Sequence, residues 1–426
     1  MKTYQEPAKE ILVSREVDVL VVGSGPAGIG AAIRAGRAGA KTMLIESQGC
    51  VGGIATAGMM SHWGGKSSSR IYQEIIQKSM NMRDIDDGMG CEINAIHHEQ
   101  LKFLLFDLLK QAHVEVLLYT FACGVIVENG ILRGVIVENK TGRSLILAKN
   151  TVDATGDGDV AAMAGVPYTL GRETDHKMQP CTVMFKVGGV DTKRAVFPGS
   201  FETLVNTDIG ELQALAKETL PFPAGHVLLY KTPHPSVVCC NMTNCINTDG
   251  SKAEDLTSAT YTCYSQMGPI ISFLRKYVPG YENCYLLTAA SLLGIRETRH
   301  FTGLSTLQSD DILQAHYHED WAVREAFFNF DVHNLDGASL DKTGIQRNWQ
   351  QNATYTIPYG CLIPINVDGL LLSGRNISGS HLAHSNFRIM TVCMALGEAA
   401  GLAAALCTQQ DIRPRDLNVT VLQDIL

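Results

Sequence analysis

The residues best suited to chemistry near the start of the chain are three glycines spaced as Gly23-x-Gly25-x-x-Gly28. They follow a valine-rich run, Val17 to Val22, which is typical of a buried parallel strand. In such a loop the first glycine makes the turn, the second lets the backbone approach a pyrophosphate, and the third lets the next helix pack closely. The helix N-terminus then offers free N–H groups to phosphates. We predict a dinucleotide site that also includes Ser24, Pro26 and Ala27.

A second apolar run, Lys41 to Ile45, ends in Glu46, an acid suited to bind the ribose hydroxyls of an adenosine. A nicotinamide dehydrogenase would normally continue with another helix and strand. Here Ser47 leads instead into a glycine-rich loop with a Gly52-Gly53 doublet, which suits backbone running along an extended cofactor. The expected cofactor contacts in this loop include Ile54 and Thr56.

A third small-residue turn, Ala154-Thr155-Gly156-Asp157, follows the apolar segment Thr151 to Asp153. Small side chains let the backbone cross close to a nucleotide, so we expect cofactor contact here too. The alternative is an ordinary strand-to-helix turn with an aspartate as N-cap.

A cluster of charges follows an apolar run at Arg296-Glu297-Thr298-Arg299. Two arginines three residues apart suit the clamping of an anionic substrate, since guanidinium groups bind carboxylates in a bidentate manner. An arginine–glutamate network at a domain boundary is the alternative, and the sequence leaves both open.

We predict no metal site. His316, His318, Glu319 and Asp320 are metal ligands by type, but their spacing favours a solvated helix face. The close cysteines Cys239, Cys240 and Cys245 fit no zinc pattern either.

The composition of the 426-residue chain is that of a globular enzyme, with 45% hydrophobic and 18% charged residues. A formal net charge of −8 argues against nucleic acid or an anionic membrane surface as a main partner. The N-terminal residues resemble no signal peptide, and we expect no membrane span. Twelve scattered cysteines suit a reducing cytoplasm, which we expect as the location.

The remaining patterns predict an α/β fold. Leucines at helical spacing predict a helix from His98 to Gln111, and another is expected from Ser69 to Ser79. After a strand over Val114 to Tyr119, two hairpin signals predict a three-stranded meander before the strand that ends at Asp153. The segment from Tyr168 to Tyr355 carries no dinucleotide signal and includes a predicted long helix, Ala253 to Tyr277.

The C-terminal stretch completes a resemblance to a known family. The matching pieces are Gly23 to Gly28, Gly52-Gly53, Val152 to Gly165, Gly294 to Arg299, Asp331-Val-His333 and Ile357 to Gly401. The sequence resembles the FAD-dependent oxidoreductases of the glutathione reductase-type superfamily, related to fumarate reductase and thiazole synthase-like flavoproteins. The resemblance implies a discontinuous Rossmann-like FAD-binding domain with a β-meander, formed by residues 1–167 and 357–426. It also implies an inserted α+β substrate domain over residues 168–356.

The resemblance also implies further contacts with FAD. Ala122 and Cys123 lie where such folds place backbone against adenine, and Gly374-Arg375 lies along the pyrophosphate and ribityl chain. The segment from Arg388 through Ala395 to Gly397 lies beside the flavin ring. A helix N-terminus aimed at this ring stabilises the negative charge of the reduced flavin.

The implied reaction is hydride transfer between a small organic substrate, such as an organic acid or a sugar, and N5 of FAD. His381 and His384 fall just before the last long helix, in a loop expected to face the flavin, so either suits a general base. Arg296 and Arg388 are the residues expected to orient the substrate. The electron acceptor or donor is unidentified, and homo-oligomerisation is compatible with the sequence.

Two alternatives remain. A flavin monooxygenase would need NAD(P)H to reduce the flavin, and the order of elements fits that class less well. A thiazole synthase-like protein would hold FAD without net redox turnover.

Overall fold

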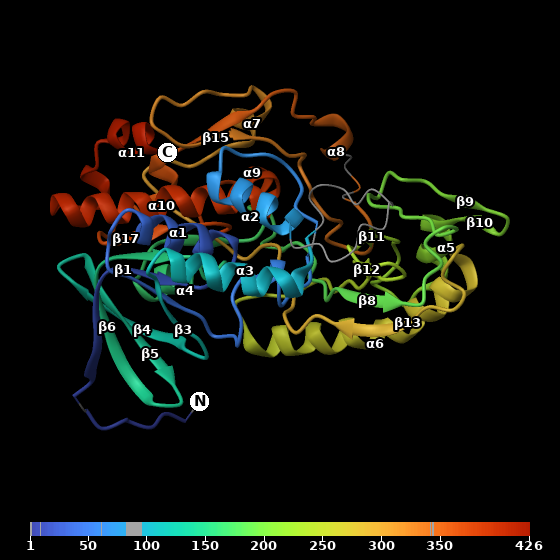
Figure 1. The fold of residues 1–426 in the computed structure, drawn as a ribbon, viewed down its shortest axis with the longest axis horizontal. Helices are drawn as coiled ribbons and strands as arrows, with labels where there is room; N and C mark the ends of the chain where they lie inside the picture. Colours follow the sequence, from blue (N-terminus) through green and yellow to red (C-terminus); the bar gives the residue numbers. More distant parts are fainter. Residues whose placement is uncertain (1, 9, 61, 82–95, 341, 343–344) are drawn as a thin grey trace.

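The computed structural model describes residues 2–8, 10–60, 62–81, 96–340, 342 and 345–426 (Figure 1). Its largest sheet has seven strands, in the order β3-β2-β1-β6-β5-β4, with β17 paired to β6 beside β5. These strands are β1 (Leu12–Val22), β2 (Thr42–Ile45), β3 (Glu115–Leu117), β4 (Phe121–Glu128), β5 (Ile131–Asn139), β6 (Gly142–Asp153) and β17 (Leu370–Leu372).

The parallel core of this sheet begins where the glycine motif predicted it. β1 pairs in parallel with β2 on one side and with β6 on the other. Helix α1 (Pro26–Arg37) starts directly after the glycine loop, with Gly25 as its N-cap. The predicted α/β class is confirmed at this level, because strand, loop, helix and strand follow each other as expected.

The predicted meander differs in one respect. Its third strand and the strand that ends at Asp153 are a single strand, β6, which is antiparallel to β5 and parallel to β1. The prediction separated them because Lys149 and Asn150 interrupt the apolar pattern. Asn150 is nevertheless buried, and its side-chain amide donates hydrogen bonds to Ala404 O and Thr408 Oγ1, so the strand continues through it.

Helices from both the N-terminal part and the C-terminal part of the chain cover this sheet. α2 (Arg70–Asn81) and α3 (His98–Gln111) agree with the helices predicted there, and α4 (Asp159–Met163) follows β6. The C-terminal part adds α9 (His381–Phe387), α10 (Met390–Gln410) and α11 (Val419–Ile425). α10 lies against α1 in the left half of the view in Figure 1.

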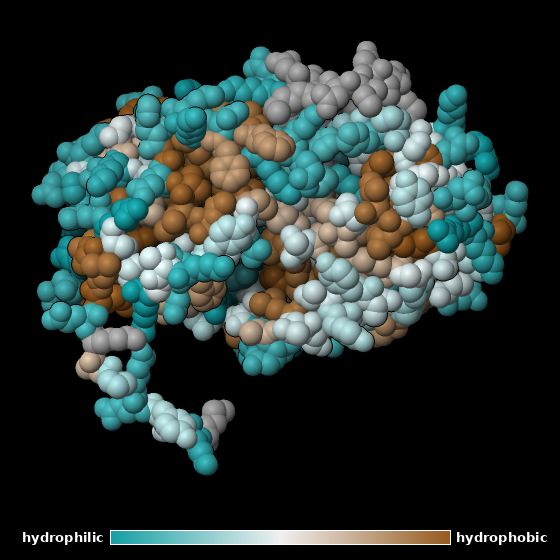
Figure 2. Space-filling view, turned by 60° about the horizontal axis from the view of Figure 1, so that its bottom comes forward, coloured by the Kyte–Doolittle hydropathy of each residue, from teal (hydrophilic) through white to brown (hydrophobic). Residues whose placement is uncertain are grey.

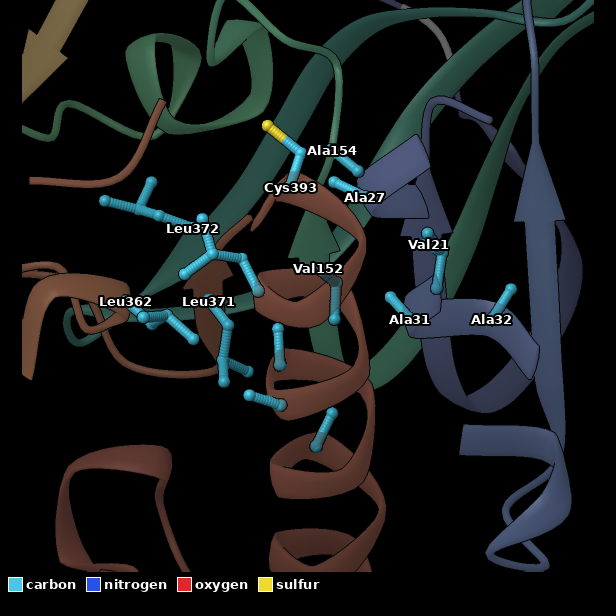
Figure 3. Packing of buried hydrophobic residues seen from close by; sticks show 14 of the residues in the cluster. Val21, Ala27, Ala31, Ala32, Val152, Ala154, Leu362, Leu371, Leu372 and Cys393 are labelled. Atoms are coloured by element: carbon cyan, nitrogen blue, oxygen red, sulfur yellow. The ribbon is translucent and has the colours of Figure 1, made fainter. Parts of the chain in front are cut away.

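The contact between α1 and α10 depends on small residues. A Cβ added to Gly397 would lie 2.0 Å from the Ala27 carbonyl oxygen, and one added to Gly401 would lie 2.1 Å from the Ala31 oxygen. Figure 3 shows Ala31 on α1 pointing toward α10, with Val152 and Leu371 on the sheet side. Among the described helices, α10 alone has the length and composition of a membrane-crossing helix, but 94% of that stretch is buried inside the protein.

A second, antiparallel sheet lies beside the first, with the strand order β11-β12-β8-β13. Its strands are β8 (Phe185–Gly188), β11 (Leu229–Lys231), β12 (Val238–Cys240) and β13 (Tyr285–Ala289). The long helix α6 (Ala253–Tyr277) has the predicted bounds and packs on this sheet through Met267, Ile270 and Leu274. The short α5 (Leu212–Thr219) contributes Leu212 and Ala216 to the same core.

Smaller elements complete the fold. Three two-stranded sheets pair β9 (Asn206–Thr207) with β10 (Gly210–Glu211), β7 (Tyr168–Leu170) with β14 (Arg299–Phe301), and β15 (Trp321–Ala326) with β16 (Tyr355–Pro358). The remaining helices are α7 (Ser309–Leu313) and α8 (Ile345–Asn348), and short 3-10 turns span Gly53–Ala55, Tyr359–Leu362 and Pro414–Asp416.

The buried side chains form two cores. The larger core contains residues up to Val166 and again from Phe301 onward, whereas the smaller core lies between Val183 and Ala290, with Met59 added. The predicted insertion, 168–356, is therefore wider than the segment that forms the smaller core. The domain boundaries stay a prediction.

The close contact between α1 and α10 predicts a large stability effect at Gly397. Gly397→Ala places a methyl group against a backbone oxygen, which we expect to lower the free energy of unfolding by about 3 kcal/mol. The measurement is denaturant unfolding followed by circular dichroism. Gly337→Ala is the control, because its added Cβ would meet its nearest atom at an ordinary 3.4 Å. Equal stability of the two variants would contradict this packing.

Candidate functional site

One cavity of about 630 Å³ lies between the parallel sheet and the antiparallel sheet. One part of its wall is formed by the glycine loop, the end of β2, and the turn after β6. The other part is formed by the segments around Tyr230, Arg296 and Asp331. Figure 2 shows patches of hydrophobic residues on one face of an otherwise largely hydrophilic surface. Because its wall has these two parts, the cavity is shared by the predicted dinucleotide site and by residues of the smaller core region.

The glycine loop has the geometry that phosphate binding requires. Gly23 has a φ of +93°, in the left-handed region that favours glycine. A Cβ on Gly28 would lie 1.8 Å from the Gly23 carbonyl oxygen, so this glycine permits the tight loop-to-helix packing. A Cβ on Gly25 would meet no atom within 4 Å, and Gly25 lines the cavity. The open space beside Gly25, at the N-terminus of α1, fits a pyrophosphate.

Glu46 lies at the end of β2 and lines the same cavity. Its Oε2 accepts hydrogen bonds from the Ser24 backbone N at 2.8 Å and from Ser24 Oγ at 2.6 Å. Its Oε1 accepts one from the Gln48 backbone N at 2.8 Å. These bonds fix the carboxylate, and its remaining lone pairs can accept hydroxyl groups of a ribose.

The turn after β6 is held in place by one ion pair. Arg375 Nη2 lies 3.0 Å from Asp157 Oδ1, and the same oxygen accepts a hydrogen bond from Thr298 Oγ1 at 2.7 Å. A Cβ on Gly156 would lie 2.6 Å from Arg375 Nη2, so the guanidinium covers this glycine closely. Gly374 has a φ of +94° and brings Arg375 to the cavity wall.

Most of the predicted cofactor contacts line the cavity. These are Gly23, Ser24, Gly25, Pro26, Ala27, Glu46, Ser47, Gly53, Ile54, Ala122, Ala154, Thr155, Gly156, Asp157, Gly374 and Arg375. The predicted contacts that lie outside its lining are Gly28, Gly52, Thr56, Cys123, Ala395 and Gly397.

The residues outside the lining have packing roles. Gly52 has a φ of +104°, and Thr56 Oγ1 donates a 2.6 Å hydrogen bond to the Val51 carbonyl. Gly397 packs on α1, about two helical turns beyond the start of α10. The part of this segment that does line the cavity is its beginning, at Arg388, Ile389, Met390 and Cys393.

His381 and His384 do not lie in a loop that faces the cavity, so that prediction was wrong. Both are buried on α9, whose N-cap is Ser380, and neither lines the cavity. His381 Nδ1 lies 2.5 Å from Glu297 Oε1, which is also 2.8 Å from His300 Nε2. A helix start at Ser380 could not be predicted, because the helical pattern in the sequence is clear only from Met390.

The cluster of Glu297, His300 and His381 is explained by hydrogen bonding. Burial would raise the pKa of Glu297, but hydrogen bonds from His300 and His381 hold it well below its usual range. Glu297 Oε2 also accepts a 3.0 Å bond from the Gln179 backbone N. Although these three side chains lie close enough to bind a metal ion, their distances are those of hydrogen bonds.

Arg296 and Arg299 do not form the predicted clamp. Arg296 lines the cavity, whereas Arg299 lies outside its lining, 2.8 Å from Asp159 Oδ1 and from the Asp157 carbonyl. They lie three positions apart, just before and at the start of β14, outside any helix, and their side chains contact different neighbours. His316, His318, Glu319 and Asp320 similarly lie in the irregular segment between α7 and β15 and not on the predicted helix face.

The inner wall opposite the glycine loop carries Asp331 and His333, for which the sequence predicted no role, beside the expected Arg296 and Arg388. Arg388 Nη2 donates to Asp331 Oδ2 at 2.7 Å and to the Asp331 carbonyl at 2.9 Å. His333 Nε2 lies 3.4 Å from Asp331 Oδ1. Arg296 and Tyr230 line the same wall. Asp331 and His333 were quoted only for the family resemblance, since no periodicity or spacing connects them to Arg388.

Two arginines and one carboxylate leave this wall positively charged. Partial burial, together with the nearby Arg388 guanidinium, lowers the pKa of Arg296 to about 10 despite the attraction of Asp331. Arg388 Nε is buried with no hydrogen-bond partner among the described residues. Buried cations and unsatisfied donors are costly, so this wall favours an anionic ligand.

These features together define an FAD-binding fold of the Rossmann type. A comparison with solved structures finds, over 96% of this chain and 83% of the other, a geranylgeranyl bacteriochlorophyll reductase-like protein from Thermoplasma acidophilum, with 14% identity and a TM-score of 0.51. The flavin-dependent brominase Bmp2 matches over the same shares of the two chains, 96% and 83%, with 12% identity and a TM-score of 0.47. A comparison with curated protein sequences finds no match.

The profile of the family described as FAD dependent oxidoreductase matches residues 18–426, so the chain belongs to this family. The protein is therefore an enzyme, and the predicted cofactor FAD is confirmed. When bound, FAD supplies an acceptor or donor of hydride. The residues that fit it are those of the glycine loop, Glu46, and the Gly156 and Arg375 turn.

The open space at Gly25 predicts a variant that separates cofactor binding from folding. In Gly25→Val the new side chain meets no protein atom within 4 Å at its Cβ, but occupies the space that fits a pyrophosphate. We expect the flavin-free protein to keep its thermal midpoint while the Kd for FAD rises at least tenfold, a loss of about 1.4 kcal/mol or more. Equilibrium titration with FAD measures the affinity, and binding at wild-type strength would contradict this assignment.

Proposed function

We propose that the protein transfers a hydride between a small organic acid and N5 of FAD. The observation that carries this proposal is the position of Arg296 and Arg388 on the wall of the same cavity that the glycine loop lines. A substrate bound at that wall would share the cavity with the cofactor. Proximity of the two reactants is what a transfer reaction requires.

The charges favour an acid over a neutral sugar. Arg388 is paired with Asp331, whereas Arg296 donates to the Pro180 carbonyl, a neutral group. A carboxylate bound between the guanidiniums would compensate the excess positive charge. Two unit charges 4 Å apart near a protein surface attract each other by about 4 kcal/mol. A neutral sugar would leave that charge uncompensated.

The chain's own residues would bind and orient the substrate. Arg296 and Arg388 hold the carboxylate, and the buried start of α10 at Met390 and Cys393 excludes water on one side. Burial raises the pKa of Tyr230 to about 12, so its hydroxyl stays protonated and is available as a hydrogen-bond donor.

We further propose a cytoplasmic location, a separate electron acceptor and no nucleic-acid partner, in keeping with the acidic composition.

Anaerobic absorbance spectra of the FAD-loaded protein test this proposal. Glycolate, lactate and malate are added one at a time, and we expect at least one of them to bleach the flavin band without a nicotinamide. Bleaching only by NADH or NADPH would favour a reductase or monooxygenase. Bleaching only by sugars would contradict an organic acid as the substrate. A flavin that none of these compounds reduces would contradict the proposal as a whole.

The role of Arg388 predicts a loss of anion affinity on conservative substitution. Arg388→Lys keeps the charge but loses the planar pair of donors, so we expect the Kd for oxalate, a non-oxidisable probe, to rise at least tenfold. Isothermal titration of the FAD-loaded protein measures it. Arg324→Lys is the matched control, because Arg324 is exposed and stacks over Trp321 at 5.1 Å. Equal oxalate affinity in both variants would remove Arg388 from the substrate site.

A further inference from the structure

His333 is a buried histidine on the wall of the cavity, and the family assignment gives it no role. It is 5% exposed, and its backbone N donates to Gln179 Oε1 at 3.3 Å. An isolated bridge between His333 and Leu340 also holds this part of the chain. The Phe201 ring meets the imidazole edge to face, with centroids 5.3 Å apart and planes at 83°. The ring is therefore held in one orientation.

Asp331 stands on one side of this imidazole. His333 Nε2 is 3.4 Å from Asp331 Oδ1, while Arg388 Nη2 is 2.7 Å from the other oxygen, Oδ2. Burial would raise the pKa of Asp331, but the neighbouring His333, Arg388 and Arg296 lower it well below its usual range. Asp331 is therefore ionised, and its two oxygens are turned to two different partners.

This arrangement selects one form of the imidazole. A carboxylate facing Nε2 favours a proton on Nε2, which leaves Nδ1 with a free lone pair. Burial, followed by the charge of Arg296, lowers the pKa of His333 to about 4. His333 is consequently neutral at pH 7, as a base must be before it accepts a proton.

Several other titratable groups near His333 are poorer bases. Burial lowers the pKa of His226 to about 3, and His226 Nε2 lies 3.1 Å from the Asn241 carbonyl. Tyr230 is protonated, as argued above, and Arg296 and Arg388 are cations. His62 lines the cavity and stacks on Tyr230 with centroids 5.5 Å apart, so it is the competitor that an experiment must separate from His333.

We infer that His333, oriented by Asp331, is the general base for oxidation of a 2-hydroxy acid in this cavity; this rests on the proposed function. The substrate O–H bond breaks and its proton forms an N–H bond at His333 Nδ1. The carbon–hydrogen bond of the same carbinol breaks, and its electron pair leaves with the hydrogen as hydride to FAD. The substrate is oxidised to a 2-oxo acid, and FAD is reduced. In the reverse direction His333 returns the proton.

The first test needs no substrate. Protein loaded with FAD is labelled with ¹⁵N-histidine, and the His333 signals are assigned from their loss in His333→Gln. We expect the neutral form with the proton on Nε2 throughout pH 5.5 to 8, and we expect Asp331→Asn to change the ratio of the two neutral forms. A proton on Nδ1, or a cationic ring at pH 7, would overturn the inference.

The second test uses whichever of glycolate, lactate and malate reduces the wild-type flavin. At a saturating concentration, His333→Gln should slow flavin reduction by about 10²- to 10⁴-fold, with the oxalate Kd and the FAD Kd changed less than threefold. His62→Gln should retain more of the rate than His333→Gln. His113→Asn, at an exposed position outside the cavity lining, is the control for histidine replacement in general.

The outcomes distinguish a failure of the role of His333 from a failure of the proposed function. A His333→Gln rate within threefold of wild type, or a larger loss in His62→Gln, overturns the role of His333 while the acid dehydrogenase stands. If none of the acids reduces the wild-type flavin, the proposed function fails and the role of His333 as its base fails with it. The histidine spectra would then still decide whether Asp331 selects the form of the ring.

Discussion

The close contact between α1 and α10 is the constraint on which the rest of the structure depends. The backbones of the two helices meet where Gly397 and Gly401 face the carbonyl oxygens of Ala27 and Ala31. This contact fixes the last long helix against the first one, although more than three hundred residues of sequence separate them. As a consequence, the start of α10 and Arg388 lie at the cavity that the N-terminal glycine loop lines. Without that contact the two halves of the site would not meet.

The two halves of the site also differ in how their charges are compensated. Near the glycine loop, charges are locally compensated, since Arg375 pairs with Asp157 and Arg299 with Asp159. At the opposite wall, Asp331 pairs with Arg388, and Arg296 is attracted by the same carboxylate without an ion pair of its own. The first pattern stabilises a turn that fits the cofactor, and the second leaves uncompensated positive charge that favours an anionic ligand. This difference is why the two walls have different proposed roles.

The cofactor half could be predicted from sequence because its signals are local. Strand, glycine loop, helix and Glu46 follow one another within one short segment, and their geometry depends on residues that are close in the chain. The helix from Ala253 to Tyr277 was equally predictable, because its apolar residues repeat at helical spacing on one face.

The half of the cavity proposed to bind the substrate could not be predicted in the same way. Asp331, His333 and Arg388 meet through tertiary packing between segments that carry no shared pattern. His381 and His384 were chosen because they precede a clear helix, but Ser380 starts a shorter helix that buries both. Arg299 was paired with Arg296 by spacing, whereas its partner, Asp159, comes from the turn after β6. In a segment without regular secondary structure, the spacing of residues along the chain does not predict where their side chains point.

The central claim is that one cavity holds both the flavin and the wall of Arg296, Arg388, Asp331 and His333. The most direct measurement is a crystal structure of the protein loaded with FAD. We predict that the pyrophosphate lies beside Gly25 and that the isoalloxazine ring extends toward Arg388 and His333. A flavin ring that points away from this wall, with the pyrophosphate still at the glycine loop, would contradict the account.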